Sequence, residues 1–142
     1  MATKPLKGHI TSGYGKRINP ITKKSEFHPG IDIAPLSRSN EPVVCAKKGK
    51  IAYIDTEGKG SFGKVVYVVM PDKWYAVYPH LQAINKNIHI GDSVEEGVFI
   101  GLCGNTGLSA GIHLHYEERN AMGVNSLKRS PDDIIALYNN QN

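Results

Sequence analysis

Short apolar runs separated by glycine and proline dominate the middle of the chain. Gly49–Asp55 alternates apolar and polar side chains, as a half-buried strand does. The glycine-rich segment 58–63 joins it to a β-branched run, Lys64–Met70. Pro71-Asp72 then leads into a third run, Trp74–Tyr78. Links this short connect antiparallel neighbours, so the pattern predicts a β-meander.

One helix is expected near the end of the chain, over about residues 130–138. Ser130 can cap it, Pro131 suits its first position, and two aspartates follow at the positive end of the helix dipole. Elsewhere, 15 glycines and 8 prolines favour many turns and short strands. A length of 142 residues suffices for one core, and no linker or repeat interrupts it. We therefore predict a mainly β fold, with residues 1–142 forming a single small domain of antiparallel sheets.

Charge and hydropathy narrow the range of partners. The formal charge of +4 favours anionic partners, but no Lys/Arg run is interleaved with aromatic residues, so nothing points to nucleic acid. No apolar run approaches the roughly 18 residues of a membrane span. The N-terminal residues contain no apolar core of signal-peptide length. Cys45 and Cys103 both lie in apolar strand-like runs, which favours buried free thiols over a disulfide or a metal role.

Histidines in two short motifs are candidate metal ligands. In the first, Pro29 argues against a helix, so His28 is expected on a loop that enters a strand. The next strand should turn Ile31 and Ile33 to the core and Asp32 to the opposite face. The motif is weak by itself, because a surface histidine and an aspartate bonded to the backbone would look the same.

The second motif is His113-Leu114-His115. Residues i and i+2 of a strand share a face, so both imidazoles should point the same way while Leu114 enters the core. Two histidines on one face can bind a metal, or one can bind while the other acts as a base. A solvated pair remains the alternative. His80 follows an apolar strand at Tyr78-Pro79, where a lone histidine is more often structural than catalytic.

Together these residues indicate a catalytic metal site more strongly than any one of them does alone. A catalytic zinc takes three protein ligands and keeps one position open for water. His28, Asp32 and one histidine of the 113/115 pair would supply three, leaving the other histidine and His80 for acid–base work. The sequence has no H-E-x-x-H motif, no G-x-S-x-G nucleophile motif and no Walker loop. Cys103 remains a minor alternative as a nucleophile.

Three segments, in this order, resemble the lysostaphin/LytM family of peptidoglycan endopeptidases. They are His28 to Asp32, Tyr78 to Leu81 and Gly104 to Glu117, and the resemblance extends over about residues 12–118. It implies a small antiparallel β fold with a loop-walled groove. The site residues that it implies are the zinc ligands His28, Asp32 and His115 and the catalytic histidines His80 and His113.

The same resemblance implies a Zn²⁺ metalloendopeptidase that hydrolyses cross-bridge or stem peptides of bacterial peptidoglycan at the cell wall. The family usually has Thr and Pro where this chain has Ala110 and Ile112, which affects the loop beside the site but no ligand. Without a signal peptide, we expect a phage lysin released through a holin or a virion-associated enzyme with other phage tail proteins as partners. The alternative is a non-catalytic LytM-like module that binds or regulates cell-wall components.

Overall fold

The computed structural model describes residues 2–19, 21–37, 40–106, 111–123 and 125–139. Within these ranges the strands, in chain order, are β1 (Gly8–Ser12), β2 (Gly15–Ile18), β3 (Ser25–His28), β4 (Gly30–Pro35), β5 (Pro42–Val44), β6 (Gly49–Asp55), β7 (Lys64–Val69), β8 (Tyr75–Ile84), β9 (Ser93–Val94), β10 (Phe99–Cys103), β11 (Leu114–Arg119) and β12 (Lys128–Arg129). The helix α1 (Asp132–Asn139) follows them.

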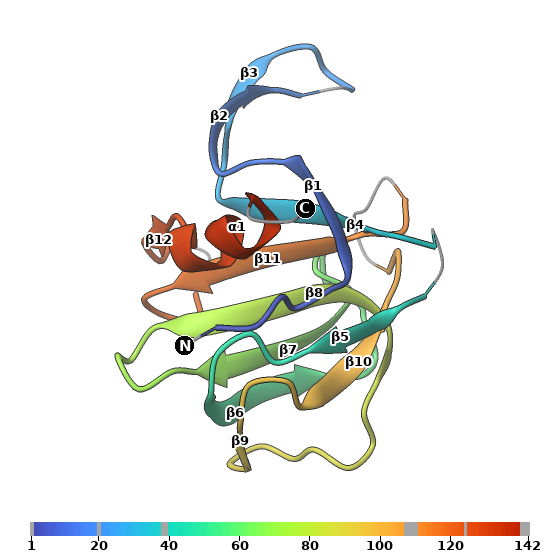
Figure 1. Cartoon of the computed structure of the whole chain (residues 1–142), viewed down its shortest axis with the longest axis vertical. Helices are drawn as coiled ribbons and strands as arrows, with labels where there is room; N and C mark the ends of the chain where they lie inside the picture. The colour runs from blue at the N-terminus through green and yellow to red at the C-terminus, as the bar shows by residue number, and fades with distance from the viewer. Residues whose placement is uncertain (1, 20, 38–39, 107–110, 124, 140–142) are drawn as a thin grey trace.

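The main sheet is antiparallel and runs in the order β1-β4-β11-β8-β7-β6-β9, as can be followed in Figure 1. β10 pairs with both β5 and the far end of β8, and β12 pairs with β11. The predicted mainly β fold is confirmed, and β6, β7 and β8 form the predicted meander. β8 is longer than its predicted strand, which ended at Tyr78, because it continues through a bulge beside Lys64 to Ile84.

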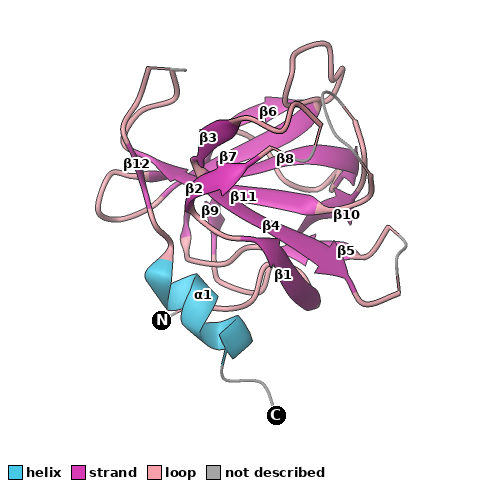
Figure 2. Ribbon diagram, turned by 90° about the horizontal axis from the view of Figure 1, so that it is seen from above, coloured by secondary structure: helices cyan, strands magenta, loops and turns pink. Residues whose placement is uncertain are grey.

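The core lies against the inner faces of these strands and beneath the helix. The rings of Tyr78 and Tyr116, both fully buried, lie 5.5 Å apart between β8 and β11. From α1, Tyr138 reaches the N-terminal segment, where its hydroxyl donates to the carbonyl of Leu6. Figure 2 shows α1 at one side of the sheet, close to the N-terminus. Both cysteines are buried free thiols, as predicted. No described helix is long and apolar enough to cross a bilayer.

The helix starts slightly later than its sequence predicted. It begins at Asp132, and Pro131 precedes it, with the Pro131 carbonyl accepting from the amide of Ile135 at 2.9 Å. The Ser130 hydroxyl bonds the Asp132 carboxylate rather than a backbone amide of the first turn. Pro131 therefore stands one residue before the position that its sequence suggested.

A two-stranded hairpin, β2–β3, stands apart from the main sheet at the top of Figure 1. The rings of Tyr14 and Phe27 pack edge to face at its base, 5.1 Å apart. His28 pairs with Gly15 as the last residue of β3. The predicted loop position of His28 was therefore wrong, because the pairing of this hairpin is not visible in the hydrophobic pattern of either strand.

β4 and β11 approach each other closely where the hairpin joins the sheet. Asp32 of β4 lies opposite His115 of β11, and Gly30 lies opposite Glu117. A Cβ on Gly30 would lie 2.3 Å from the carbonyl oxygen of Tyr116, closer than two such atoms can come. The pairing of these strands therefore requires glycine at this position.

Replacing Gly30 by Ala is expected to lower the free energy of unfolding by about 1–3 kcal/mol, because the two backbones must move apart. Denaturant unfolding, followed by circular dichroism, measures the change. Gly60→Ala is the matched control, since nothing lies within 4 Å of its added Cβ. Equal stabilities of the two variants would contradict the close approach.

Candidate metal centre

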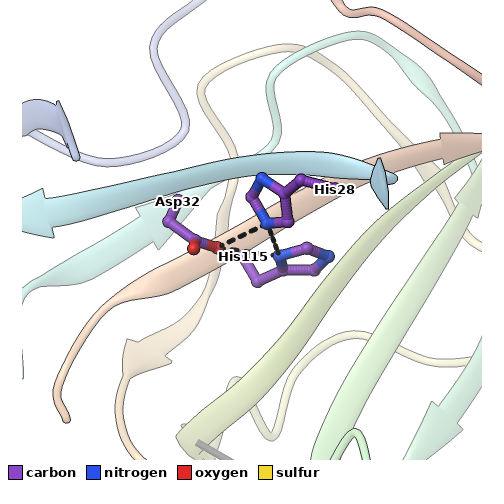
Figure 3. Close-up of side chains that lie close together, drawn as sticks. All are labelled: His28, Asp32 and His115. Atoms are coloured by element: carbon purple, nitrogen blue, oxygen red, sulfur yellow. Dashed lines mark hydrogen bonds and ion pairs between the residues drawn. The ribbon is translucent and has the colours of Figure 1, made fainter. Parts of the chain in front are cut away.

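Three side chains from the paired strands and the hairpin converge at one point. His28 Nε2 lies 3.3 Å from Asp32 Oδ1 and 3.3 Å from His115 Nδ1, and His115 Nδ1 lies 2.8 Å from Asp32 Oδ1. Figure 3 shows the three side chains pointing toward one another. Their donor atoms all lie within 4.8 Å of one another, which places them around a space that one ion could share.

Local geometry explains how residues so far apart in sequence meet here. Ile31 and Ile33 are fully buried on one face of β4, so Asp32 points to the other face. On β11, Leu114 is fully buried and His115 shares the opposite face with Asp32. The predicted alternation of side chains around Asp32 and His115 is thus present in the structure.

Each of the three side chains is fixed by a second partner. His28 Nδ1 lies 2.8 Å from the Gly13 carbonyl, so it must donate, and Nε2 carries the lone pair. His115 Nε2 lies 2.7 Å from Glu117 Oε2 and donates to it, so in the neutral ring Nδ1 would carry the lone pair and could bind a metal. Asp32 turns Oδ2 toward Arg17 Nη1 at 3.3 Å. Two oriented imidazoles and one carboxylate are a ligand set that zinc accepts in catalytic sites.

Electrostatics shows that the centre favours a positive charge. Burial by itself would lower the pKa of His115, but hydrogen bonds to Asp32 and Glu117 raise this pKa to about 9. Burial would likewise raise the pKa of Asp32, but its bonds to His115 and His28 hold this pKa well below its usual range. Both pKa shifts have the same cause, which is the close approach of carboxylates to imidazoles, so the centre stabilises positive charge.

His80 lies in the bulge of β8 and faces the same centre. Its backbone is left-handed, with φ of 60°, a conformation that non-glycine residues rarely adopt. Two hydrogen bonds hold it there, from its amide to the Phe62 carbonyl at 2.7 Å and from Nδ1 to the Thr106 carbonyl at 2.7 Å. Burial lowers the pKa of His80, and the nearby His113 and His115 add to this effect.

His113 lies one residue before β11, where it forms a bridge with Gly104. Its Nδ1 lies 2.8 Å from the Gly111 carbonyl and its Nε2 lies 3.7 Å from Asp32 Oδ1. The rings of His80 and His113 are 5.8 Å apart. The structure therefore places all five candidate residues from the sequence around one centre.

The five residues line a cavity of about 410 Å³. Arg17, Phe62 and Glu117 also line it, and sequence reasoning had given none of these three a role at the site. The sequence could have identified Glu117 as a site residue, because it follows His115 by two residues and must share its face of the strand. Ala110, the first of the two departures from the family pattern, lies outside the described residues. Ile112, the second, is 38% exposed.

Comparisons with known proteins show which proteins this chain resembles. The DD-carboxypeptidase/endopeptidase Mpg of Neisseria meningitidis serogroup B is 35% identical over 117 residues, which are 82% of this chain and 26% of Mpg. The catalytic domain of lysostaphin from Staphylococcus simulans has a TM-score of 0.73 to this chain and is 26% identical to it, over 91% of this chain and 92% of that domain.

A third similar protein is a zinc-containing peptidase from Vibrio cholerae. Its TM-score is 0.68 and its identity 28%, over 90% of this chain and 39% of that one. The chain spans about a quarter of the length of Mpg. Residues 26–127 match the sequence model of peptidase family M23. Since this match covers well over half of the chain and the fold is that of lysostaphin-type peptidases, the chain belongs to peptidase family M23.

Proposed function

We propose that the chain is a zinc-dependent endopeptidase that hydrolyses peptide bonds of bacterial peptidoglycan. The observation that carries this proposal is the convergence of His28, Asp32 and His115 beside two further histidines in one cavity. His28 Nε2, Asp32 Oδ1 and His115 Nδ1 would hold the ion. A bound zinc would supply a Lewis acid and lower the pKa of a water to about 7.

His80 and His113 would handle the proton. His80 donates through Nδ1 to the Thr106 carbonyl, which leaves Nε2 as a proton acceptor, and burial favours its neutral form by lowering its pKa. His113 has the same tautomer, set by the Gly111 carbonyl. One of the two would take a proton from water, and the other would assist the leaving amine or the developing oxyanion.

The peptide substrate is inferred from the relatives. Mpg is named a DD-carboxypeptidase/endopeptidase, and lysostaphin is named an antimicrobial peptidase. The presence of both catalytic candidates supports an enzyme over the non-catalytic wall-binding module that the sequence left open. The phage origin and the tail-protein partners stay predictions from the sequence.

Digestion of purified peptidoglycan tests the proposal. With zinc, we expect new amine ends, which mass spectrometry would assign to a cross-bridge or stem-peptide bond. With a chelator, we expect none, and adding zinc back should restore them. If several wall types stayed intact with zinc demonstrably bound, the proposed activity would be wrong and the non-catalytic module would gain support.

A further inference from the structure

His115 has a different partner on each ring nitrogen. Figure 3 shows one nitrogen pointing toward Asp32 and the other pointing away. The outer nitrogen, Nε2, lies 2.7 Å from Glu117 Oε2, and the other oxygen of this carboxylate accepts from Arg119 Nε at 2.8 Å. Glu117 is 1% exposed and Arg119 is 5% exposed. Arg119, Glu117 and His115, which alternate along β11, are thus linked by a buried series of hydrogen bonds that ends at a candidate metal ligand.

This series of contacts continues from Arg119 to Phe62, which also lines the cavity. The Arg119 guanidinium carbon lies 4.8 Å from the centre of the Phe62 ring. The Phe62 ring meets His80 edge to face, with centroids 6.1 Å apart, and the Phe62 carbonyl accepts from the amide of His80. Arg119 therefore contacts both Glu117, which bonds His115, and Phe62, whose carbonyl accepts from the amide of His80.

Burial makes this chain of contacts sensitive to the loss of any member. A carboxylate removed from water is costly unless it is paired, and Glu117 is paired on both oxygens. Arg119 Nε donates to Oε1 of Glu117, which leaves Oε2 for His115. The carboxylate is thus directed to the outer nitrogen of His115.

We propose that Glu117 and Arg119 are positioning residues of the metal centre. Glu117 fixes the ring orientation and the tautomer of His115, and Arg119 fixes Glu117 while it supports the Phe62 wall beside His80. The inference rests on the proposed zinc function and names two residues that would determine how well the site binds metal.

Zinc affinity, measured by competition with a chromophoric chelator, tests the role of Glu117. Outer partners of metal-binding histidines typically contribute about 10- to 100-fold to affinity. We expect Glu117→Met to weaken zinc binding by about this factor, because the neutral Met thioether is only a weak acceptor for the proton on Nε2. Glu117→Gln keeps an acceptor oxygen and should recover most of the lost affinity.

Glu117→Met leaves Arg119 buried without its carboxylate partner, and this variant could fail to fold. A double variant then provides the test. Glu117→Met/Arg119→Met removes both charges, and apolar replacement of a whole buried ion pair is often neutral for stability. This variant should fold and still bind zinc about 10- to 100-fold more weakly than the wild type. Wild-type affinity in the folded double variant would overturn the proposal.

Glu118 provides the matched control on the same strand. It is fully buried but faces the other way, where it bonds Lys47, Arg129 and the hydroxyl of Tyr116. Glu118→Met should lower the melting temperature but leave the zinc affinity of the folded protein unchanged. An equal loss of affinity in this variant would show a general effect of a lost buried carboxylate and would overturn the specific role of Glu117. Because the readout is affinity, failure of the wild type to cut peptidoglycan would refute the substrate and leave this comparison valid.

Discussion

Replacing His115 by Ala is expected to abolish both zinc binding and hydrolysis. The variant would lose Nδ1, which lies 2.8 Å from Asp32 Oδ1 at the centre of the candidate site. It would also leave the Glu117 carboxylate without one of its two partners. The loss of a ligand should exceed the roughly 10- to 100-fold that follows from losing an outer partner. Metal analysis after dialysis, together with the peptidoglycan digest, measures the result.

His9→Ala is the control for this substitution. His9 is an exposed histidine of β1 that does not line the cavity, so the variant should keep its zinc and its activity. Full metal occupancy in His115→Ala would refute the assignment of His115 as a ligand.

Replacing His113 by Ala should have the second largest effect, on turnover alone. Its Nδ1 is fixed by the Gly111 carbonyl and its Nε2 lies 3.7 Å from Asp32 Oδ1, beside the three candidate ligands. General acid–base groups contribute about 10²- to 10⁴-fold, so kcat should fall by that factor while zinc stays bound. Steady-state cleavage of a defined stem or bridge peptide, with metal content measured in parallel, separates the two effects.

The two histidines on either side of Leu114 thus make a paired test. If His113→Ala came out metal-free and His115→Ala kept its zinc, the roles of the two residues would be reversed. If His113→Ala bound zinc and turned over at the wild-type rate, catalysis by this histidine would be excluded.

The sequence predicted the features that depend on side-chain alternation within a single strand. Alternation along Gly49–Asp55 predicted β6 with the same ends that the structure has. Alternation around Asp32 and His115 also predicted which side chains face the site. These patterns depend on a period of two along one strand, which a sequence shows directly.

What the sequence missed depends on pairing between distant segments. The β2–β3 hairpin is held by register pairs such as Gly15 with His28, and neither strand has a strong apolar pattern. The predicted third strand stopped at Tyr78, just before Pro79, and proline is unusual inside a central strand. The structure continues β8 through a bulge in which His80 takes a left-handed backbone. Pro79 therefore does not end β8 but lies in its bulge, next to the cavity-lining residue His80.

The register of β4 with β11 has a consequence for how the protein folds. Asp32 and His115 are 83 residues apart in the chain, so their meeting closes one of its long loops. Contacts of such high sequence separation are slow to form, because the entropy of loop closure precedes any gain from pairing. The ligand set exists only after this closure. A metal that binds there acts on the finished structure, so it would mainly slow unfolding and would do little to speed folding.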